Sequence, residues 1–120
     1  MTALVATLGS GKGSWSYLIK LIKAFEWDRV VLVTNSFGAE RFSVENKELS
    51  FVIVNDREGL FQLESEIREK LSGILTDETQ VAVNFISGEG KLHMAVLSSL
   101  LKLGLGIRLV TVKDEKVEEV

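Results

Sequence analysis

Residues 81–94 read VAVNFISGEGKLHM, and this stretch decides how the rest of the chain is expected to fold. Its first part predicts a buried strand, through the apolar residues Val81, Val83, Phe85 and Ile86. The glycine turn 87–90 follows, and a helical pattern begins at Lys91. Such a turn places unpaired N–H groups and the positive end of a helix dipole where they favour an anion. An ordinary turn that uses glycine only for its backbone angles is the alternative.

A second glycine turn follows the first apolar run of the chain. Residues 3–8 (ALVATL) predict a strand of the continuous apolar type that parallel sheets bury on both faces. The loop 9–14 (GSGKGS) comes next, with Ser14 as the expected N-cap of a helix. This loop is not a P-loop, because Gly13 stands where Ser or Thr must follow the lysine, and its glycine spacing does not fit G-x-G-x-x-G. Lys12 and two hydroxyls leave it a weaker phosphate-binding character.

Strands and helices alternate through the rest of the chain. The patterns predict strands at 30–34, 51–54, 81–86 and 107–112, and helices at 15–25, 38–46, 60–75 and 91–103. This order is typical of an α/β protein, a Rossmann-like three-layer fold with a mostly parallel five-stranded sheet. The charged tail 113–120 is a candidate sixth strand. Ligands of such folds bind beyond the carboxyl ends of the strands, where the strand order reverses. If the strands before the two glycine turns are neighbours there, both turns line one crevice.

Composition limits the classes of function. The chain has 120 residues, 46% of them hydrophobic and 26% charged, which fits one globular domain over residues 1–120. It has no cysteine and one histidine, so we expect no disulfide, no metal centre and no cofactor. The net charge of −3 does not favour duplex nucleic acid. No apolar run reaches the roughly 20 residues of a membrane span and no signal peptide is evident, so a cytoplasmic protein is expected.

The helix expected at 91–103 is apolar on more than one side. Its apolar residues are Leu92, Met94, Ala95, Val96, Leu97, Leu100, Leu101 and Leu103. A helix of this kind is central in a fold or lies at a subunit interface, and a domain of this size has little room to bury it. We therefore expect a homodimer that packs this helix and brings two copies of each glycine turn together.

The sequence resembles the CRISPR-associated Rossmann-fold (CARF) domains, which sense cyclic oligoadenylate second messengers. The resemblance lies in Thr7-Leu8-Gly9, in SGEGKLHM at 87–94, and in the apolar helix followed by GLGIRLV at 104–110. The family typically has a Ser/Thr-Gly-rich turn after strand four, then a lysine and a methionine three residues on. Glu89 departs from this pattern, because the family usually has a small or hydroxyl residue there. A carboxylate at this point repels a phosphate unless it points away.

The resemblance implies a two-fold dimer whose crevice cradles a ring of adenylates, with cyclic tetra-adenylate as the expected ligand. The two turns then supply the candidate ligand-binding residues Gly9, Ser10, Gly11, Lys12, Ser87, Gly88, Glu89, Gly90 and Lys91. Asn35 and Ser36, after the second strand, are candidates for contact with a ribose or base.

Family members usually carry a fused nuclease or DNA-binding domain, so a sensor-type domain alone resembles a ring nuclease, which ends CRISPR type III signalling by cleaving the messenger. Such enzymes use no metal, and a ribose 2′-OH attacks the adjacent phosphate to form a cyclic phosphate. Lys91 would stabilise the developing charge, and Ser10 or Ser14 would orient the reacting group. The alternatives are a non-catalytic nucleotide sensor that acts through a separate partner and a structural dimer without a ligand, which Glu89 favours.

Overall fold

A computed structural model describes residues 2–120, with the side chain of Lys12 outside the description. The six strands are β1 (Ala3–Thr7), β2 (Arg29–Thr34), β3 (Ser50–Ile53), β4 (Gln80–Asn84), β5 (Gly106–Lys113) and β6 (Lys116–Glu119). The helices are α1 (Trp15–Lys23), α2 (Ser36–Arg41), α3 (Leu60–Ile74) and α4 (Gly90–Lys102), and a 3-10 turn, η1 (Lys12–Ser14), precedes α1. Within residues 2–120, the chain forms no helix with the length and apolar character to cross a membrane.

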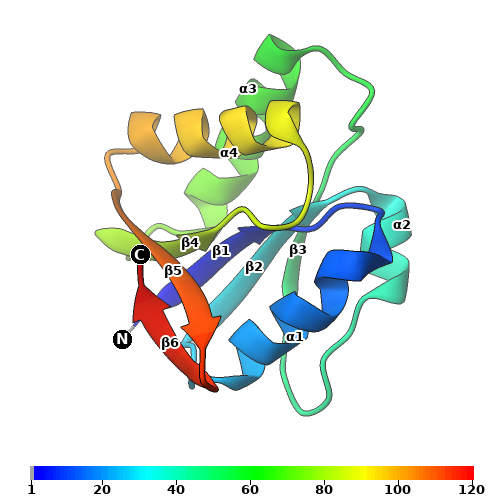
Figure 1. The fold of residues 1–120 in the computed structure, drawn as a ribbon. Helices are drawn as coiled ribbons and strands as arrows, with labels where there is room; N and C mark the ends of the chain where they lie inside the picture. The colour runs from blue at the N-terminus through cyan, green and yellow to red at the C-terminus, as the bar shows by residue number, and fades with distance from the viewer. Residues whose placement is uncertain (1) are drawn as a thin grey trace.

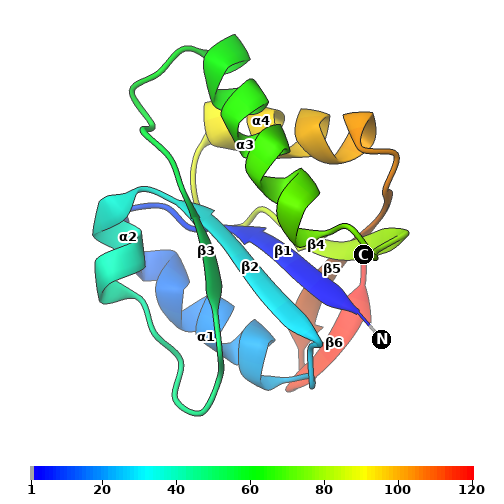
Figure 2. The ribbon, with the colours of Figure 1, turned by 180° about the vertical axis from the view of Figure 1, so that it is seen from behind.

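All six strands form one sheet in the order β3-β2-β1-β4-β5-β6. Strands β1 to β5 are parallel, and β6 pairs with β5 in the antiparallel direction. Helices α3 and α4 cover one face, whereas α1 and α2 cover the other, as Figures 1 and 2 show from opposite sides. The Rossmann-like three-layer fold is therefore confirmed, and the charged tail supplies the sixth strand.

The strand order reverses between β1 and β4. From β1 the chain builds outward to β2 and β3, and from β4 it builds outward in the opposite direction to β5. The pairs Leu4–Ala82, Val5–Val83 and Ala6–Asn84 set the register between these two central strands. Because both are parallel, the two glycine turns that follow them leave the sheet at the same edge.

Two apolar layers explain why the central strands are continuously apolar. Ala3 and Val5 pack beneath α3 and α4, whereas Leu4 and Ala6 pack beneath α1. All four side chains are fully buried. A strand covered by helices on both faces has no solvent face, so alternation of apolar and polar residues disappears.

The prediction that the fourth strand reaches Ile86 was wrong. Strand β4 ends at Asn84, whose buried side-chain amide donates to the carbonyl of Val110 at 2.8 Å and to the Tyr17 hydroxyl at 3.2 Å. Its Oδ1 accepts from the N–H of Ile86 at 3.0 Å, and this local bond turns the chain away from the sheet. Ile86 is consequently 59% exposed.

The helix predicted at 38–46 was also placed wrongly. It covers Ser36–Arg41, because Asn35 caps it: the Asn35 Oδ1 accepts from the N–H of Gly38 at 3.0 Å. The chain beyond Arg41 is extended, and Phe42 and Val44 enter the core. Gly104 follows the end of α4 with φ of +75°, a conformation that favours glycine, and Gly106 is the first residue of β5.

A strained two-residue turn joins β5 and β6. Lys113 pairs with Lys116, so that Asp114 and Glu115 alone form the turn, and their φ angles are +52° and +62°. Hairpins with positive φ at both turn residues favour Asn-Gly, because a side chain in this conformation meets the following carbonyl group. Aspartate is tolerated at the first of these positions, so the local conflict between sequence and fold lies at Glu115.

Replacement of Glu115 by glycine should stabilise the protein by about 1 kcal/mol, because glycine adopts positive φ without steric cost. At this chain length that corresponds to a rise in melting temperature of about 4 °C, measurable by calorimetry. Glu118→Gly provides the matched control, since Glu118 is an exposed residue within β6, where glycine should cost about 0.5–1 kcal/mol. An equal loss of stability in both variants would contradict the strained turn.

Candidate functional site

A cavity of about 340 Å³ opens at the carboxyl ends of the central strands. Its lining comes from the two glycine turns and from the chain segments that follow β2 and β3. The lining residues are Leu8, Gly9, Ser10, Gly11, Ser14, Thr34, Asn35, Val54, Asp56, Ile86, Gly88, Glu89 and Leu92. The cavity thus lies at the point where the strand order reverses, and both turns contribute to it as the sequence predicts.

Ser87 joins the two turns. Its hydroxyl oxygen accepts from the N–H of Gly9 at 2.8 Å and from the Ser14 hydroxyl at 2.7 Å. Its carbonyl oxygen accepts from the Thr7 hydroxyl at 2.6 Å. Ser87 is only 1% exposed, so these bonds are shielded from competing water. The serine therefore fixes the loop after β1 against the turn after β4.

The two turns also touch through their backbones. A Cβ atom on Gly9 would lie 2.8 Å from the nitrogen and 2.9 Å from the Cα of Gly88. Gly88 itself has φ of +96°, a conformation that favours glycine. The contact between the turns consequently requires glycine on both sides.

His93 supports the second turn from within α4. Its Nε2 lies 2.8 Å from the carbonyl oxygen of Ser87, and its ring stacks on Phe85 with 5.3 Å between the ring centroids. Because a carbonyl oxygen only accepts, Nε2 must carry the hydrogen. His93 is therefore a positioning residue for the turn, and it does not line the cavity.

Glu89 occupies the N-terminus of α4. Its two carboxylate oxygens accept from the N–H of Lys91 at 2.8 Å and from the N–H of Leu92 at 3.1 Å. These are N–H groups on which the predicted anion site depends. The carboxylate satisfies them and also neutralises the positive end of the helix dipole. An incoming phosphate therefore meets an N-terminus that already holds an anion.

The side chain of Lys91 is engaged on a neighbouring loop. Its ammonium donates to the carbonyl of Asp56 at 2.7 Å and to the carbonyl of Glu58 at 2.8 Å. Both acceptors lie in the loop between β3 and α3. Lys91 is absent from the cavity lining, so a role toward a phosphate requires release of this contact.

A polar cluster bridges the cavity between the first loop and the loop after β3. The side-chain nitrogen of Asn35 donates to Asp56 Oδ2 at 2.9 Å and to Ser10 Oγ at 3.3 Å. Asp56 was not among the predicted ligand-binding residues. The sequence places it only in a turn before a helix, and it enters the cavity because β3 lies beside β2 in the sheet.

The remaining predicted residues differ in where they lie. Ser87 is buried, and Ser14 gives its hydrogen to Ser87 instead of capping α1. Ser36 and Gly90 are exposed residues in the first turns of their helices, and neither lines the cavity. The predicted contact of Lys12 with the ligand depends on its side chain, which the structure does not describe. Ser10, Gly11, Asn35 and Gly88 do line the cavity.

The described part of the cavity wall carries negative charge. Asp56 and Glu89 are the charged residues among the described lining, which leaves out the side chain of Lys12, and the other polar side chains there are hydroxyls and one amide. Across residues 2–120, no group of three or more histidine or acidic side chains could hold a metal ion. The chemistry that this wall offers is hydrogen-bond acceptance, together with backbone N–H groups at the turns.

Neither a family model nor a curated protein matches this sequence. Comparison with solved structures finds chains of similar fold. One of these is Csm6 from Enterococcus italicus, solved with cyclic hexa-2'-fluoro-hexa-dAMP bound. The likeness has a TM-score of 0.62 at 14% identity and covers 98% of this chain. The chain spans only 35% of the length of that Csm6 chain, and at this identity the likeness shows the fold alone.

A second solved structure is the C-terminal domain of the PF1911 hydrogenase from Pyrococcus furiosus. It has a TM-score of 0.48 at 15% identity, with 90% of each chain covered. That score is too low to establish a shared fold.

Gly9→Ala should destabilise the protein by about 2 kcal/mol or more, because the added methyl group meets the backbone of Gly88, which has no side chain to move aside. Urea unfolding measures the loss. Gly11→Ala is the matched control in the same loop: its Cβ would meet nothing within 4 Å, and its stability should change by about 0.5 kcal/mol or less. Similar stability of the two variants would show that the turns do not constrain each other.

Proposed function

We propose that this protein binds a cyclic oligoadenylate, with cyclic tetra-adenylate as the first candidate, at the cavity between its two glycine turns. The observation that carries the proposal is the position of this cavity at the carboxyl ends of β1 and β4, where the strand order reverses. The fold that it shares with Csm6, a protein solved with a cyclic adenylate analogue bound, supports the same ligand class.

We further propose that the bound ring is cleaved without a metal, which would end a CRISPR type III signal. In this step the 2′-oxygen of one ribose forms a bond to the adjacent phosphorus, and the bond from phosphorus to the 5′-oxygen breaks. The 2′-hydroxyl loses its proton, and the departing 5′-oxygen gains one. The products are a 2′,3′-cyclic phosphate and a free 5′-hydroxyl, so no oxidant or further reactant is needed.

Lys91 and Ser10 are the residues to which we assign this chemistry. Lys91 would leave the carbonyls of Asp56 and Glu58 and stabilise the charge that develops on the phosphate. Ser10 is favoured over Ser14 as the orienting hydroxyl. It lines the cavity and accepts from Asn35, so its own hydrogen stays free for the ligand, whereas Ser14 donates its hydrogen to Ser87.

A non-catalytic sensor acting through a separate partner is the second candidate. Two observations favour it: the ammonium of Lys91 is already held by two carbonyls, and Glu89 occupies the N-terminus of α4. A protein that binds the ring but leaves both contacts intact would lack the positive charge that cleavage requires.

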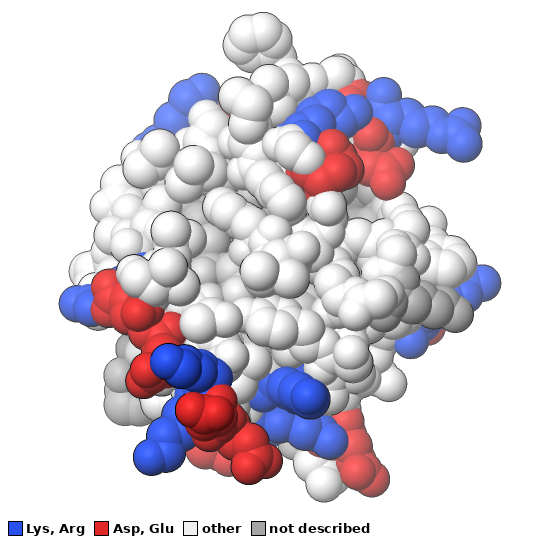
Figure 3. All heavy atoms as spheres, in the orientation of Figure 1, with Lys and Arg blue, Asp and Glu red and all other residues white. Residues whose placement is uncertain are grey.

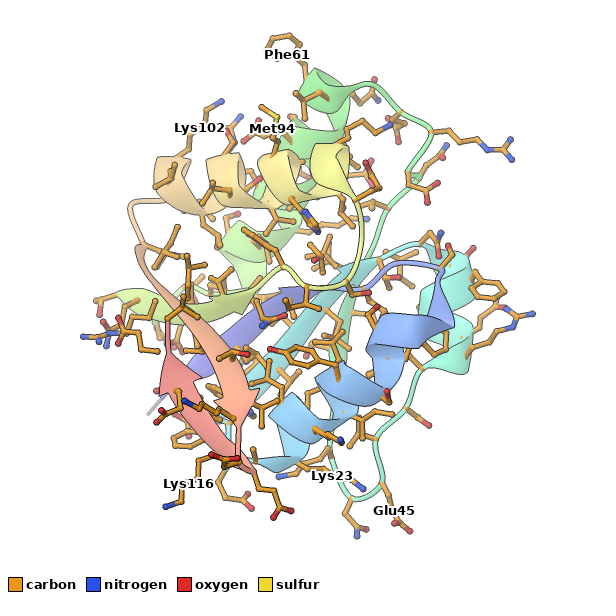
Figure 4. All side chains as sticks on the ribbon, viewed as in Figure 1. Lys23, Glu45, Phe61, Met94, Lys102 and Lys116 are labelled. Atoms are coloured by element: carbon orange, nitrogen blue, oxygen red, sulfur yellow. The ribbon has the colours of Figure 1, made fainter. Side chains whose placement is uncertain are left out.

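A homodimer formed through α4 is part of the proposal. One side of α4 packs on α3 and the sheet, whereas Met94, Leu97 and Leu101 remain exposed along its outer side. On the face seen in Figure 3, charged side chains gather near the rim and leave a broad uncharged area in the middle. Figure 4 shows Met94 pointing away from the sheet beside Lys102 and Phe61. An apolar stripe of this kind supports contact with a second copy.

Calorimetric titration with cyclic tetra-adenylate tests ligand binding, and chromatography of the incubated ring tests cleavage. Lys91→Gln should weaken binding by about tenfold and abolish cleavage, because a charge-assisted contact to phosphate is lost. Glu89→Gln should strengthen binding by about fivefold, since the competing negative charge is removed. The unfolding free energy, measured alongside, separates these effects from loss of the fold.

Lys102→Gln is the matched control, because Lys102 lies at the opposite end of α4 and should leave binding unchanged. Tight binding without any linear product would support the sensor. An absence of heat with all cyclic oligoadenylates would overturn the ligand assignment.

Leu101→Lys should convert a dimer into a monomer with little change in stability, because Leu101 is 61% exposed and a lysine near the C-terminus of a helix complements its dipole. Light scattering coupled to size-exclusion chromatography measures the mass. Val120→Lys is the control: Val120 is 85% exposed after β6, at the edge of the sheet and away from α4, and its replacement should leave the dimer intact. A monomeric unmodified protein at high concentration would contradict the interface.

A further inference from the structure

The expected ligand and the described wall of the cavity carry charge of the same sign. A ring of adenylates carries a negative charge on every phosphate, and the charged residues of the described lining are Asp56 and Glu89. Like charges in a partly enclosed space repel. The part of the ligand that enters the cavity is therefore expected to be uncharged and to carry hydrogen-bond donors.

Asp56 is held so that it presents its carboxylate to the cavity. Its Oδ2 accepts from Asn35, and its backbone carbonyl accepts from Lys91. The loop around it is closed by Asn55, whose Oδ1 accepts from the N–H of Arg57 at 3.0 Å and whose carbonyl accepts from the N–H of Glu58 at 3.2 Å. The carboxylate is thus anchored from both its side chain and its backbone.

Asp56 nevertheless retains capacity to accept. A carboxylate has about four acceptor positions, and the described contacts of this one use a single position, from Asn35. Among the described side chains, which do not include that of Lys12, none forms an ion pair with Asp56. An anchored acceptor of this kind binds a donor with little loss of side-chain freedom.

We propose that Asp56 selects the nucleoside portion of the ligand, accepting hydrogen bonds from its donor groups, while the phosphates lie at the glycine turns, away from Asp56. The donors of an adenosine unit are the ribose hydroxyls and the exocyclic amino group of the base, and both have the same chemistry toward a carboxylate. Leu8, Val54 and Leu92 in the lining provide apolar surface for the flat face of a base. This inference rests on the proposed function for the identity of the base.

The test uses adenosine, which has the donor groups but no phosphate. Titration of the isotope-labelled protein should shift the amide resonances of Gly9, Asn35 and Gly88. Asp56→Asn should weaken adenosine binding by about fivefold to tenfold, because a charged acceptor is replaced by a neutral one of the same shape. Asp77→Asn is the matched control, since Asp77 is an exposed residue of the turn before β4, at the opposite edge of the sheet.

Two further probes locate the donor. If 2′-deoxyadenosine binds more weakly than adenosine, and Asp56→Asn no longer lowers its affinity, the contact is to the ribose. If inosine gives this result instead, the contact is to the amino group of the base. Inorganic pyrophosphate, which has no nucleoside, should not lose affinity for the variant. Asp56→Asn should leave pyrophosphate binding unchanged or strengthen it, because a repulsive charge is lost.

The outcomes separate this inference from the proposed function. Adenosine binding that depends on Asp56 supports the inference even if cyclic tetra-adenylate does not bind, in which case the ring assignment fails. Cyclic tetra-adenylate that binds equally to the protein and to Asp56→Asn, or adenosine that shifts no cavity resonance, overturns the inference. In the first of these cases the proposed function stands.

Discussion

The hydrogen bonds of the buried residue Ser87 are the interaction on which the geometry of the site depends. Its hydroxyl and its carbonyl tie the loop after β1 to the turn after β4, and the Gly9–Gly88 approach leaves no room for adjustment. Because these bonds lie in a region shielded from water, breaking one leaves a buried polar group without a partner. Ser87 consequently fixes the two glycine turns relative to the central strands.

Groups of the chain itself already satisfy the elements that attract an anion. Glu89 fills the N-terminus of α4, and Lys91 is committed to the loop after β3. A ligand gains only the difference between its own contacts and those that it displaces. This compensation explains why the described cavity wall offers acceptors, and it supports the proposed contact of the nucleoside with Asp56.

Sequence periodicity predicted most of the fold. Continuous apolar strands, amphipathic helices and glycine turns gave the element order and the parallel sheet, because burial on one or both faces imposes a distinct pattern. The errors arose where a single side chain redirected the backbone. Asn84 ends β4 and Asn35 starts α2 through side-chain bonds to nearby N–H groups, and such bonds leave no periodic signal. The site was predicted as the pair of turns together with Asn35 and Ser36, and Asp56 was missed.

The sequence by itself determined the α/β class, the two glycine turns and the position of Lys91 at the start of a helix, since these are local properties of spacing and residue type. Only the tertiary structure decided that Lys91 contacts a distant loop and that Asp56 faces the cavity. The physical reason is that hydrogen bonds between segments depend on strand order. The parallel sheet brings residues 9, 35, 56 and 88 to one edge, although they are far apart along the chain.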